Sequence, residues 1–227
     1  MSGEHVNMTG LDKLRKRQIR KSLPPKLAVT FLMMLFGCAM SMLAVFLECA
    51  SAESLPQWLT SIDIRSFSVS LLPWVFMALP IALFARTPLR AAVNVGAFFS
   101  GKWIGRLVYL SLITHTQLAW DDFRFWLIFT AVSPLIAVVC WYGRGVGASA
   151  GFAAALIISF FFLYVFHFTS TFREFGFHWQ YGFLPLIFLA VAIGMLWRRP
   201  LQSLFSVLGG FALAYIYVLL PFSIPVV

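Results

Sequence analysis

The chain is a succession of long apolar runs separated by short polar connections. Seven runs can be drawn, at about residues 27–49, 67–85, 91–115, 125–142, 150–170, 182–197 and 203–224. Most approach the ~20 residues that a helix needs to cross the hydrocarbon core of a bilayer. Because that core offers the backbone no hydrogen-bond partners, such runs predict helices. The pattern therefore predicts an all-α, polytopic membrane bundle of seven transmembrane helices.

Two of the runs leave an alternative to weigh. The first precedes a signal-like A-S-A tripeptide at residues 50–52, but its unbroken stretch, residues 27–47, is longer than the ~7–15 residues of a signal-peptide core. We interpret it as an uncleaved helix. The sixth run is short and contains Pro185, yet joining it to the seventh would bury Arg198 and Arg199 in hydrocarbon, which is costly. Seven separate helices therefore remain the preferred count.

Prolines occur inside three of the runs. They are Pro73, Pro80, Pro134 and Pro185. A proline removes one helical hydrogen bond and kinks the helix, so these positions have the properties of hinges in a transport cycle. The simpler interpretation is that membrane helices commonly contain proline, and it is favoured by that base rate.

The distribution of basic residues predicts the orientation. With a cytoplasmic N-terminus, twelve of the 17 Lys and Arg residues fall on the cytoplasmic side, and three, Arg65, Arg124 and Arg173, fall outside. Acidic residues from Glu48 onward lie at the outer edge or outside. This is the asymmetry of the positive-inside rule. We therefore predict a basic cytoplasmic segment at residues 1–26, a single bundle at 27–227, and a C-terminus outside.

The composition agrees with a membrane location and favours lipid over nucleic acid as the partner of the basic residues. The chain is 61% hydrophobic and 11% charged, with a net charge of +9, and its mean hydropathy is +0.88. A soluble domain needs more charge to cover its surface. Because the basic residues cluster beside the first run, they predict contact with anionic lipid and not with nucleic acid.

Motifs for catalysis or for a cofactor are not found in the sequence. Its three scattered cysteines predict neither a disulfide framework nor a zinc site. There is no nucleotide-binding fingerprint and no nucleophile motif. We therefore expect no cofactor and favour a protein that is not an enzyme.

The stretch GKWIGRLVY, residues 101–109, places two cations inside the third run. On a helix at ~100° per residue, several polar or small side chains share an arc of ~100°. They are Asn94, Gly101, Lys102, Gly105 and Tyr109, with Arg106 just beyond the edge. The G-x-x-x-G pair permits close helix packing, so this face should point into the bundle.

A charge near the bilayer centre needs a partner or a solvated cavity. Glu48, at the outer end of the first run, is the candidate partner of Arg106. Lys102 has no carboxylate in reach and would use Asn94, Tyr109, backbone carbonyls or water. In one interpretation these four residues of the third run bind an anionic solute or lipid headgroup. In the other, an ion pair fixes helix register while Lys102 snorkels. We give the two equal weight.

Histidines and carboxylates gather on the side assigned to the outside. They are His115, His167, His178, Asp121 and Asp122. Imidazole and carboxylate groups can bind zinc. The spacing, however, matches no metal motif, and an interface rich in amphipathic residues explains it more simply. We predict no metal site and keep these residues as minor candidates.

Residues 86–101 (RTPLRAAVNVGAFFSG) and 133–143 (SPLIAVVCWYG) resemble a group of uncharacterised multi-pass membrane proteins of bacteria. The similarity covers mainly the second to fourth predicted helices. The resemblance implies a location in the bacterial cytoplasmic membrane. It implies no activity and no functional residues.

Three functions are compatible with these features. The leading hypothesis is a small-solute permease or a membrane subunit of a transport system, with Lys102, Arg106 and Asn94 lining the path. The second is a non-catalytic accessory or scaffold protein that works with other membrane subunits. The third is a membrane-embedded enzyme using the outer His and Asp residues. A polar cavity at Lys102 favours the first, a dry packed bundle the second, and a metal at the histidines the third.

Overall fold

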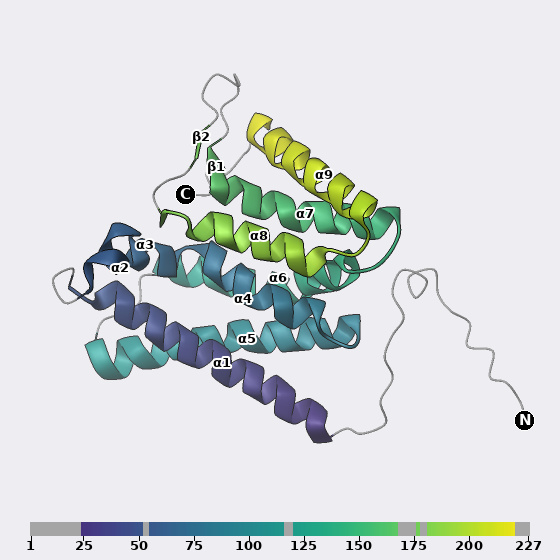
Figure 1. Cartoon of the computed structure of the whole chain (residues 1–227). Coiled ribbons are helices and arrows are strands. Elements are labelled where there is room, and N and C mark those ends of the chain that lie inside the picture. Colours follow the sequence, from purple (N-terminus) through teal and green to yellow (C-terminus); the bar gives the residue numbers. More distant parts are fainter. Residues whose placement is uncertain (1–23, 52–54, 116–119, 168–175, 178–180, 221–227) are drawn as a thin grey trace, which may run out of the picture.

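A computed structural model describes residues 24–51, 55–115, 120–167, 176–177 and 181–220 (Figure 1). The all-α class is confirmed, because these ranges are almost entirely helical. Each of the seven apolar runs overlaps a helix of 13 residues or more. These helices are α1 (Pro24–Cys49), α4 (Leu71–Leu83), α5 (Pro88–Tyr109), α6 (Trp120–Gly143), α7 (Ala148–Val165), α8 (Leu184–Leu196) and α9 (Pro200–Leu219). Most of the basic segment at residues 1–26 lies outside the described residues.

Four of the described helices are long and apolar enough to cross a membrane. They contain the spans Leu27–Cys49, Arg124–Gly143, Ala148–Val165 and Pro200–Leu219. Large apolar side chains on them, including Leu27, Phe205 and Leu135, are about 70% exposed or more. Extensive exposed apolar surface is unusual for a monomer in water and fits an integral membrane protein.

The seven predicted crossings stay a prediction. Helices α4 and α8 have 13 residues each. At ~1.5 Å per residue, each is about 20 Å long, which is less than the ~30 Å of a hydrocarbon core. Helix α5 has 22 residues and is long enough, but it carries cations within its length.

The second run is a broken helix, so the prediction of one helix over 67–85 is wrong. Two short helices, α2 (Gln57–Ser61) and α3 (Ile64–Val69), precede α4, and extended backbone at Ser70 separates α3 from α4. Pro73 lies in the first turn of α4 and Pro185 in the first turn of α8. The first-turn N–H groups of a helix have no intrahelical partner, so proline is tolerated there. Pro80 and Pro134 lie inside helices.

The ends of three other runs also differ from the prediction. Helix α7 stops at Val165, and β1 (Phe166–His167) pairs antiparallel with β2 (Gly176–Phe177). The Phe166 and Phe177 rings meet with centroids 4.8 Å apart, a contact between distant residues that the local pattern does not register. A π-helical turn, η3 (Leu110–Thr114), follows α5. Helix α9 begins at Pro200, not 203, and ends at Leu219.

Successive long helices run in opposite directions, so their connections gather at two ends of the bundle (Figure 1). The α4–α5, α6–α7 and α8–α9 connections lie at one end. There, Trp141 Nε1 donates to the Ala85 carbonyl at 2.8 Å, and Arg198 Nε donates to the Arg144 carbonyl at 3.2 Å. We call this the basic end, because it carries Arg86, Arg90, Arg144, Arg198 and Arg199.

The opposite end, which we call the acidic end, carries all the acidic residues of the described part of the chain. They are Glu48, Asp63, Asp121 and Asp122. Arg65 also lies there and donates to the Glu48 backbone carbonyl at 3.0 and 3.2 Å. The charge asymmetry of the sequence is therefore an asymmetry between the two ends of the folded bundle.

Aromatic side chains form much of the core. Helices α1 and α5 lie along one side of the bundle and α7 and α9 along the other, with α4 and α6 between them (Figure 1). Trp141, Phe98 and Phe161 are fully buried. Phe76 of α4 stacks on Phe188 of α8 with ring centroids 3.9 Å apart. Large rings dominate core energetics because each removes much apolar surface from solvent.

Candidate functional site

The face of α5 that carries GKWIGRLVY packs against α1 at backbone distance. A Cβ atom added at Gly101 would overlap the Met34 carbonyl oxygen of α1, and one at Gly105 would overlap the Cys38 carbonyl oxygen. Glycine at these positions is what lets the two helices approach so closely. The predicted small-residue face is therefore the α1–α5 contact, and the contact directs the neighbouring Lys102 and Arg106 into the bundle.

Lys102 is buried between aromatic rings, with only 6% of its surface exposed. Its ammonium nitrogen lies 4.6 Å from the ring centroid of Trp74 and 2.6 Å from that of Trp126. Trp74 belongs to α4 and Trp126 to α6. A cation over the face of an indole is attracted by the negative charge density of the ring, more strongly where water is excluded. Lys102 thus joins α5 to two further helices.

Trp74 is held in place by its own hydrogen bond. Its Nε1 donates to the Ser68 carbonyl of α3 at 3.0 Å. Its ring lies against that of Trp126, with centroids 6.4 Å apart in an edge-to-face arrangement. A buried Trp commonly needs a partner for its N–H, and this bond fixes the ring that faces Lys102.

Arg106 forms an ion pair with Glu48, the partner named from the sequence. Arg106 Nη1 lies 2.8 Å from Glu48 Oε2, and Nη2 lies 3.5 Å from Oε1. The side chains are 19% and 35% exposed, respectively. Two hydrogen bonds between one guanidinium and one carboxylate are a strong and directional contact. The pair connects α5 to the last turn of α1.

A small polar cavity lies between these groups. Its volume is about 10 Å³. Its polar lining includes Ser41, Ser68, Glu48, Lys102 and Arg106. Within the described residues, the buried Nε of Arg106 has no hydrogen-bond partner. A space of this size is comparable to that needed by a single water molecule.

Asn94, one of the four predicted binding residues, belongs to a separate network at the basic end. It is buried and accepts a hydrogen bond from Thr30 Oγ1 of α1 at 2.8 Å. Arg90 Nη1 also donates to Thr30 Oγ1, at 3.4 Å. Asn94 precedes Lys102 by eight residues, which is about 12 Å along the helix at ~1.5 Å per residue.

Tyr109 is partly buried and is the last residue of α5, directly before η3. Among the described residues, neither Tyr109 nor Asn94 lines the cavity beside Lys102. The structure thus brings Lys102, Arg106 and Glu48 together and leaves the other two apart.

The minor metal candidates stay untested. In the described ranges, no three His, Cys, Asp or Glu side chains are grouped closely enough to hold a metal. His115 is exposed and has left-handed backbone at φ 51°. Asp121 and Asp122 lie in the first turn of α6, and His167 lies in β1. His178 falls outside the described residues.

The two tryptophans that contact Lys102 are not among the residues predicted from the sequence. The helical pattern gave neither Trp74 nor Trp126 a role at the site. The available signal was the combination of an unpaired lysine with tryptophans in neighbouring apolar runs, because cation–π contacts are the alternative to a carboxylate. This combination indicates that a tryptophan could be the partner of Lys102. It does not select Trp74 and Trp126 among the eight Trp residues.

Comparison with known proteins yields no relative: no family model matches the chain, and neither a curated protein nor a solved structure matches it.

Proposed function

We propose that the chain is a non-catalytic accessory or scaffold subunit of the bacterial cytoplasmic membrane, and that the cluster around Lys102 holds its N-terminal helices in register. One observation carries the proposal. The two cations of residues 101–109 each contact a partner on another helix: Arg106 on α1, and Lys102 on both α4 and α6. The cluster thereby connects four helices around a water-sized space. A polar contact that spans several helices favours one arrangement of the bundle over alternatives.

The proposed topology has seven crossings, with the basic end in the cytoplasm. It is supported by the five arginines at one end of the fold and the four described acidic residues at the other. In this topology the short helices α4 and α8 do not span the hydrocarbon core by themselves. Helix α3 lengthens the second crossing on the acidic side, and Arg198 and Arg199 place the headgroup region directly after α8. A short apolar helix is also accommodated by thinning of the bilayer.

A reporter fused after Val227 is expected to be external, and reporters inserted after Arg90 or Arg199 are expected to be cytoplasmic. The reason is the concentration of arginine in the α4–α5, α6–α7 and α8–α9 connections. Paired phosphatase and fluorescent-protein fusions measure both outcomes at each position. A cytoplasmic C-terminus would show that the number of crossings is wrong by one.

Small-solute transport is the second candidate. It is supported by the polar cavity, which two cations and one carboxylate line and at which the Arg106 Nε lacks a partner. Transport would require the Trp74 and Trp126 rings to separate and enlarge this space. Substitution of Lys102 separates the two candidates, because a structural lysine and a solute-binding lysine respond differently to loss of charge.

The change Lys102→Met is expected to keep the protein folded, with a melting temperature close to that of the wild type, and to leave its cellular function intact. Burying an ammonium in a membrane costs at least ~2.5 kcal/mol, and two desolvated cation–π contacts of about 2 kcal/mol each offset a cost of that size, so removing the charge removes both. Methionine also retains sulfur–aromatic contact with the two indoles. The measurements are melting of the purified protein and complementation of the growth or envelope defect of a deletion strain.

Lys102→Ala is the matched control. It removes the charge as Lys102→Met does but also empties the space between the rings, and comparable truncations cost about 2–5 kcal/mol. It should therefore melt below the wild type. A stable Lys102→Met protein that fails to complement the deletion would contradict the structural role and favour transport.

A further inference from the structure

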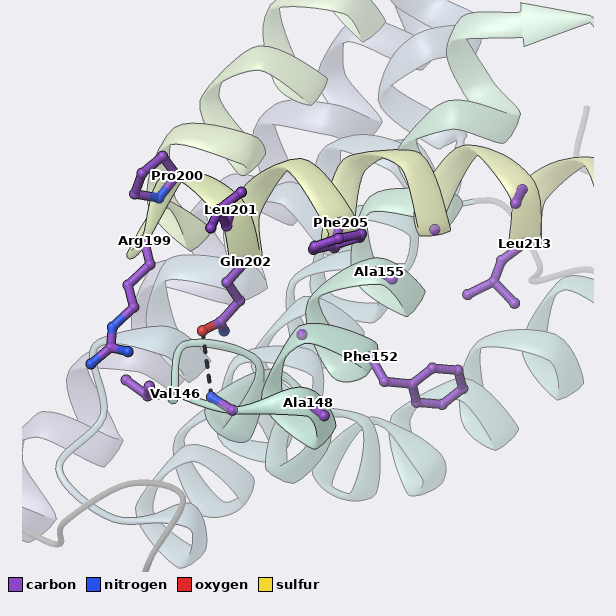
Figure 2. Close-up of a pocket in the computed structure, with 14 residues that line it drawn as sticks. Val146, Ala148, Phe152, Ala155, Arg199, Pro200, Leu201, Gln202, Phe205 and Leu213 are labelled. Carbon is purple, nitrogen blue, oxygen red and sulfur yellow. Dashed lines mark hydrogen bonds between the residues drawn. The ribbon is translucent and has the colours of Figure 1, made fainter.

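A long apolar groove runs over the surface between α7 and α9, beginning at the basic end (Figure 2). Its volume is about 900 Å³. Phe152 of α7 and Phe205 and Leu213 of α9 line its length. Small residues, such as Ala155 and Gly209, lie where the two helices touch. From Arg199 to Leu213 the groove follows about 21 Å of helix at ~1.5 Å per residue, which exceeds the ~15 Å depth of one hydrocarbon leaflet.

The mouth of this groove is positively charged. Arg199 is exposed there, and Figure 2 shows its guanidinium beside Val146 at this end of the groove. Arg198 donates to the backbone carbonyl of Arg144, which brings two more arginines to the same end. Burial, and secondarily the charge of Arg198, lowers the pKa of Arg144. The acidic residues of the described chain all lie at the other end, so none of them offsets this charge.

The polar groups beside Arg199 are organised by Gln202. Its Oε1 accepts from the Gly147 N–H at 3.4 Å, and its Nε2 donates to the Gly145 carbonyl at 3.2 Å. These contacts hold the α6–α7 connection against the start of α9. Figure 2 shows the Arg199 side chain extending from the start of α9 toward the same connection as Gln202.

We propose that this groove binds one anionic phospholipid of the cytoplasmic leaflet, with its phosphate at Arg199 and one acyl chain between α7 and α9. The inference rests on the membrane location and orientation proposed above, and not on the role of Lys102. Charge complementarity selects an anionic headgroup, and the apolar walls select a chain. Arginine binds phosphate through two parallel hydrogen bonds. Trp197 precedes these arginines in the sequence, as is typical of the depth where headgroups meet chains.

Native mass spectrometry of the full chain tests the proposal. The protein is released from detergent micelles containing either phosphatidylglycerol or phosphatidylcholine with identical acyl chains. We expect one retained phosphatidylglycerol and a preference of about tenfold over phosphatidylcholine. Both lipids carry the phosphate, but the choline ammonium of phosphatidylcholine cancels its net charge and is repelled by the arginines at this end. Equal retention of both lipids would overturn the proposal.

Three variants locate the site. Arg199→Gln should abolish the preference for phosphatidylglycerol, and Ala212→Trp, at an exposed position lining the groove, should weaken binding of both lipids by blocking the chain. Arg86→Gln is the control, since it removes the same charge from an exposed position at the same end but outside the groove. Wild-type binding by Arg199→Gln or by Ala212→Trp would overturn the assignment.

Two further experiments distinguish the lipid from other possible occupants of the groove. Inorganic phosphate that competes with phosphatidylglycerol and raises the melting temperature as much would indicate an anion site without a chain. A dimer that Ala212→Trp dissociates would indicate that a second copy fills the groove. Either result contradicts the lipid proposal.

Alkaline extraction of membranes tests the location separately. A chain that is extracted refutes the membrane proposal, whereas a retained chain without lipid preference refutes only this site.

Discussion

Gly101→Ala and Gly105→Ala are each expected to destabilise the protein severely, although alanine is a better helix former than glycine. In an exposed helix the change would contribute up to ~1 kcal/mol of stability. Here the new methyl group would overlap a backbone carbonyl oxygen of α1, at Met34 or Cys38. Backbone atoms cannot rotate away as a side chain can, so the two helices must separate. Overpacking typically costs ~1–3 kcal/mol, and a rigid obstacle places these variants at the upper end or beyond.

Thermal melting and the monodisperse fraction of the purified protein measure this effect. The control is Gly194→Ala in α8, where an added Cβ would meet nothing within 4 Å. It should melt at or above the wild-type temperature, because only the helix propensity changes. Wild-type stability of Gly105→Ala would show that α1 and α5 do not approach at backbone distance.

Separation of α1 and α5 also has a consequence for the polar cluster. Arg106 reaches Glu48 only because the two helices are close, and Lys102 is placed on the same face. The glycine variants should therefore weaken the ion pair as well. A bulkier change, Gly105→Leu, should have a still larger effect for the same reason.

The second large effect is expected from breaking the ion pair. Glu48→Gln and Arg106→Gln each leave the opposite charge without its partner in a partly buried place. Loss of one partner costs about 3–5 kcal/mol for a fully buried pair and less than ~1 kcal/mol for an exposed pair. With side chains 19% and 35% exposed, we expect a loss of ~1–3 kcal/mol for each single change.

The double variant should lose less stability than the sum of the single losses, because it leaves neither charge stranded. The shortfall is the coupling energy of the pair, for which contacting residues commonly show ~0.5–3 kcal/mol. Reversible unfolding in mixed micelles measures all four forms. Arg124→Gln, exposed at the acidic end, is the control and should change stability by less than ~0.5 kcal/mol. Additive losses for Glu48 and Arg106 would show that they do not interact.

The helices, their alternation between two charged ends, and the identity of the partner of Arg106 all follow from the sequence by itself. Long apolar runs must satisfy their backbone internally, so local pattern decides that they are helices. Glu48 was identifiable because it is the one carboxylate that lies within any of the seven apolar runs. It is at the outer end of the first run, on the side toward which Arg106 is displaced in the third run. Elimination succeeds where the chain offers a single candidate.

Only the tertiary structure decided which aromatic residues surround Lys102, and that Asn94 belongs elsewhere. A helical projection retains the angle around the axis and discards the distance along it, so Asn94 and Lys102 share a face yet lie about 12 Å apart at ~1.5 Å per residue. Trp74 and Trp126 reach Lys102 through the way α4 and α6 are rotated against α5. That rotation is set by packing between segments remote in sequence, including the glycine contact of α1 with α5. No single run contains this information, because the energy that determines it lies between runs.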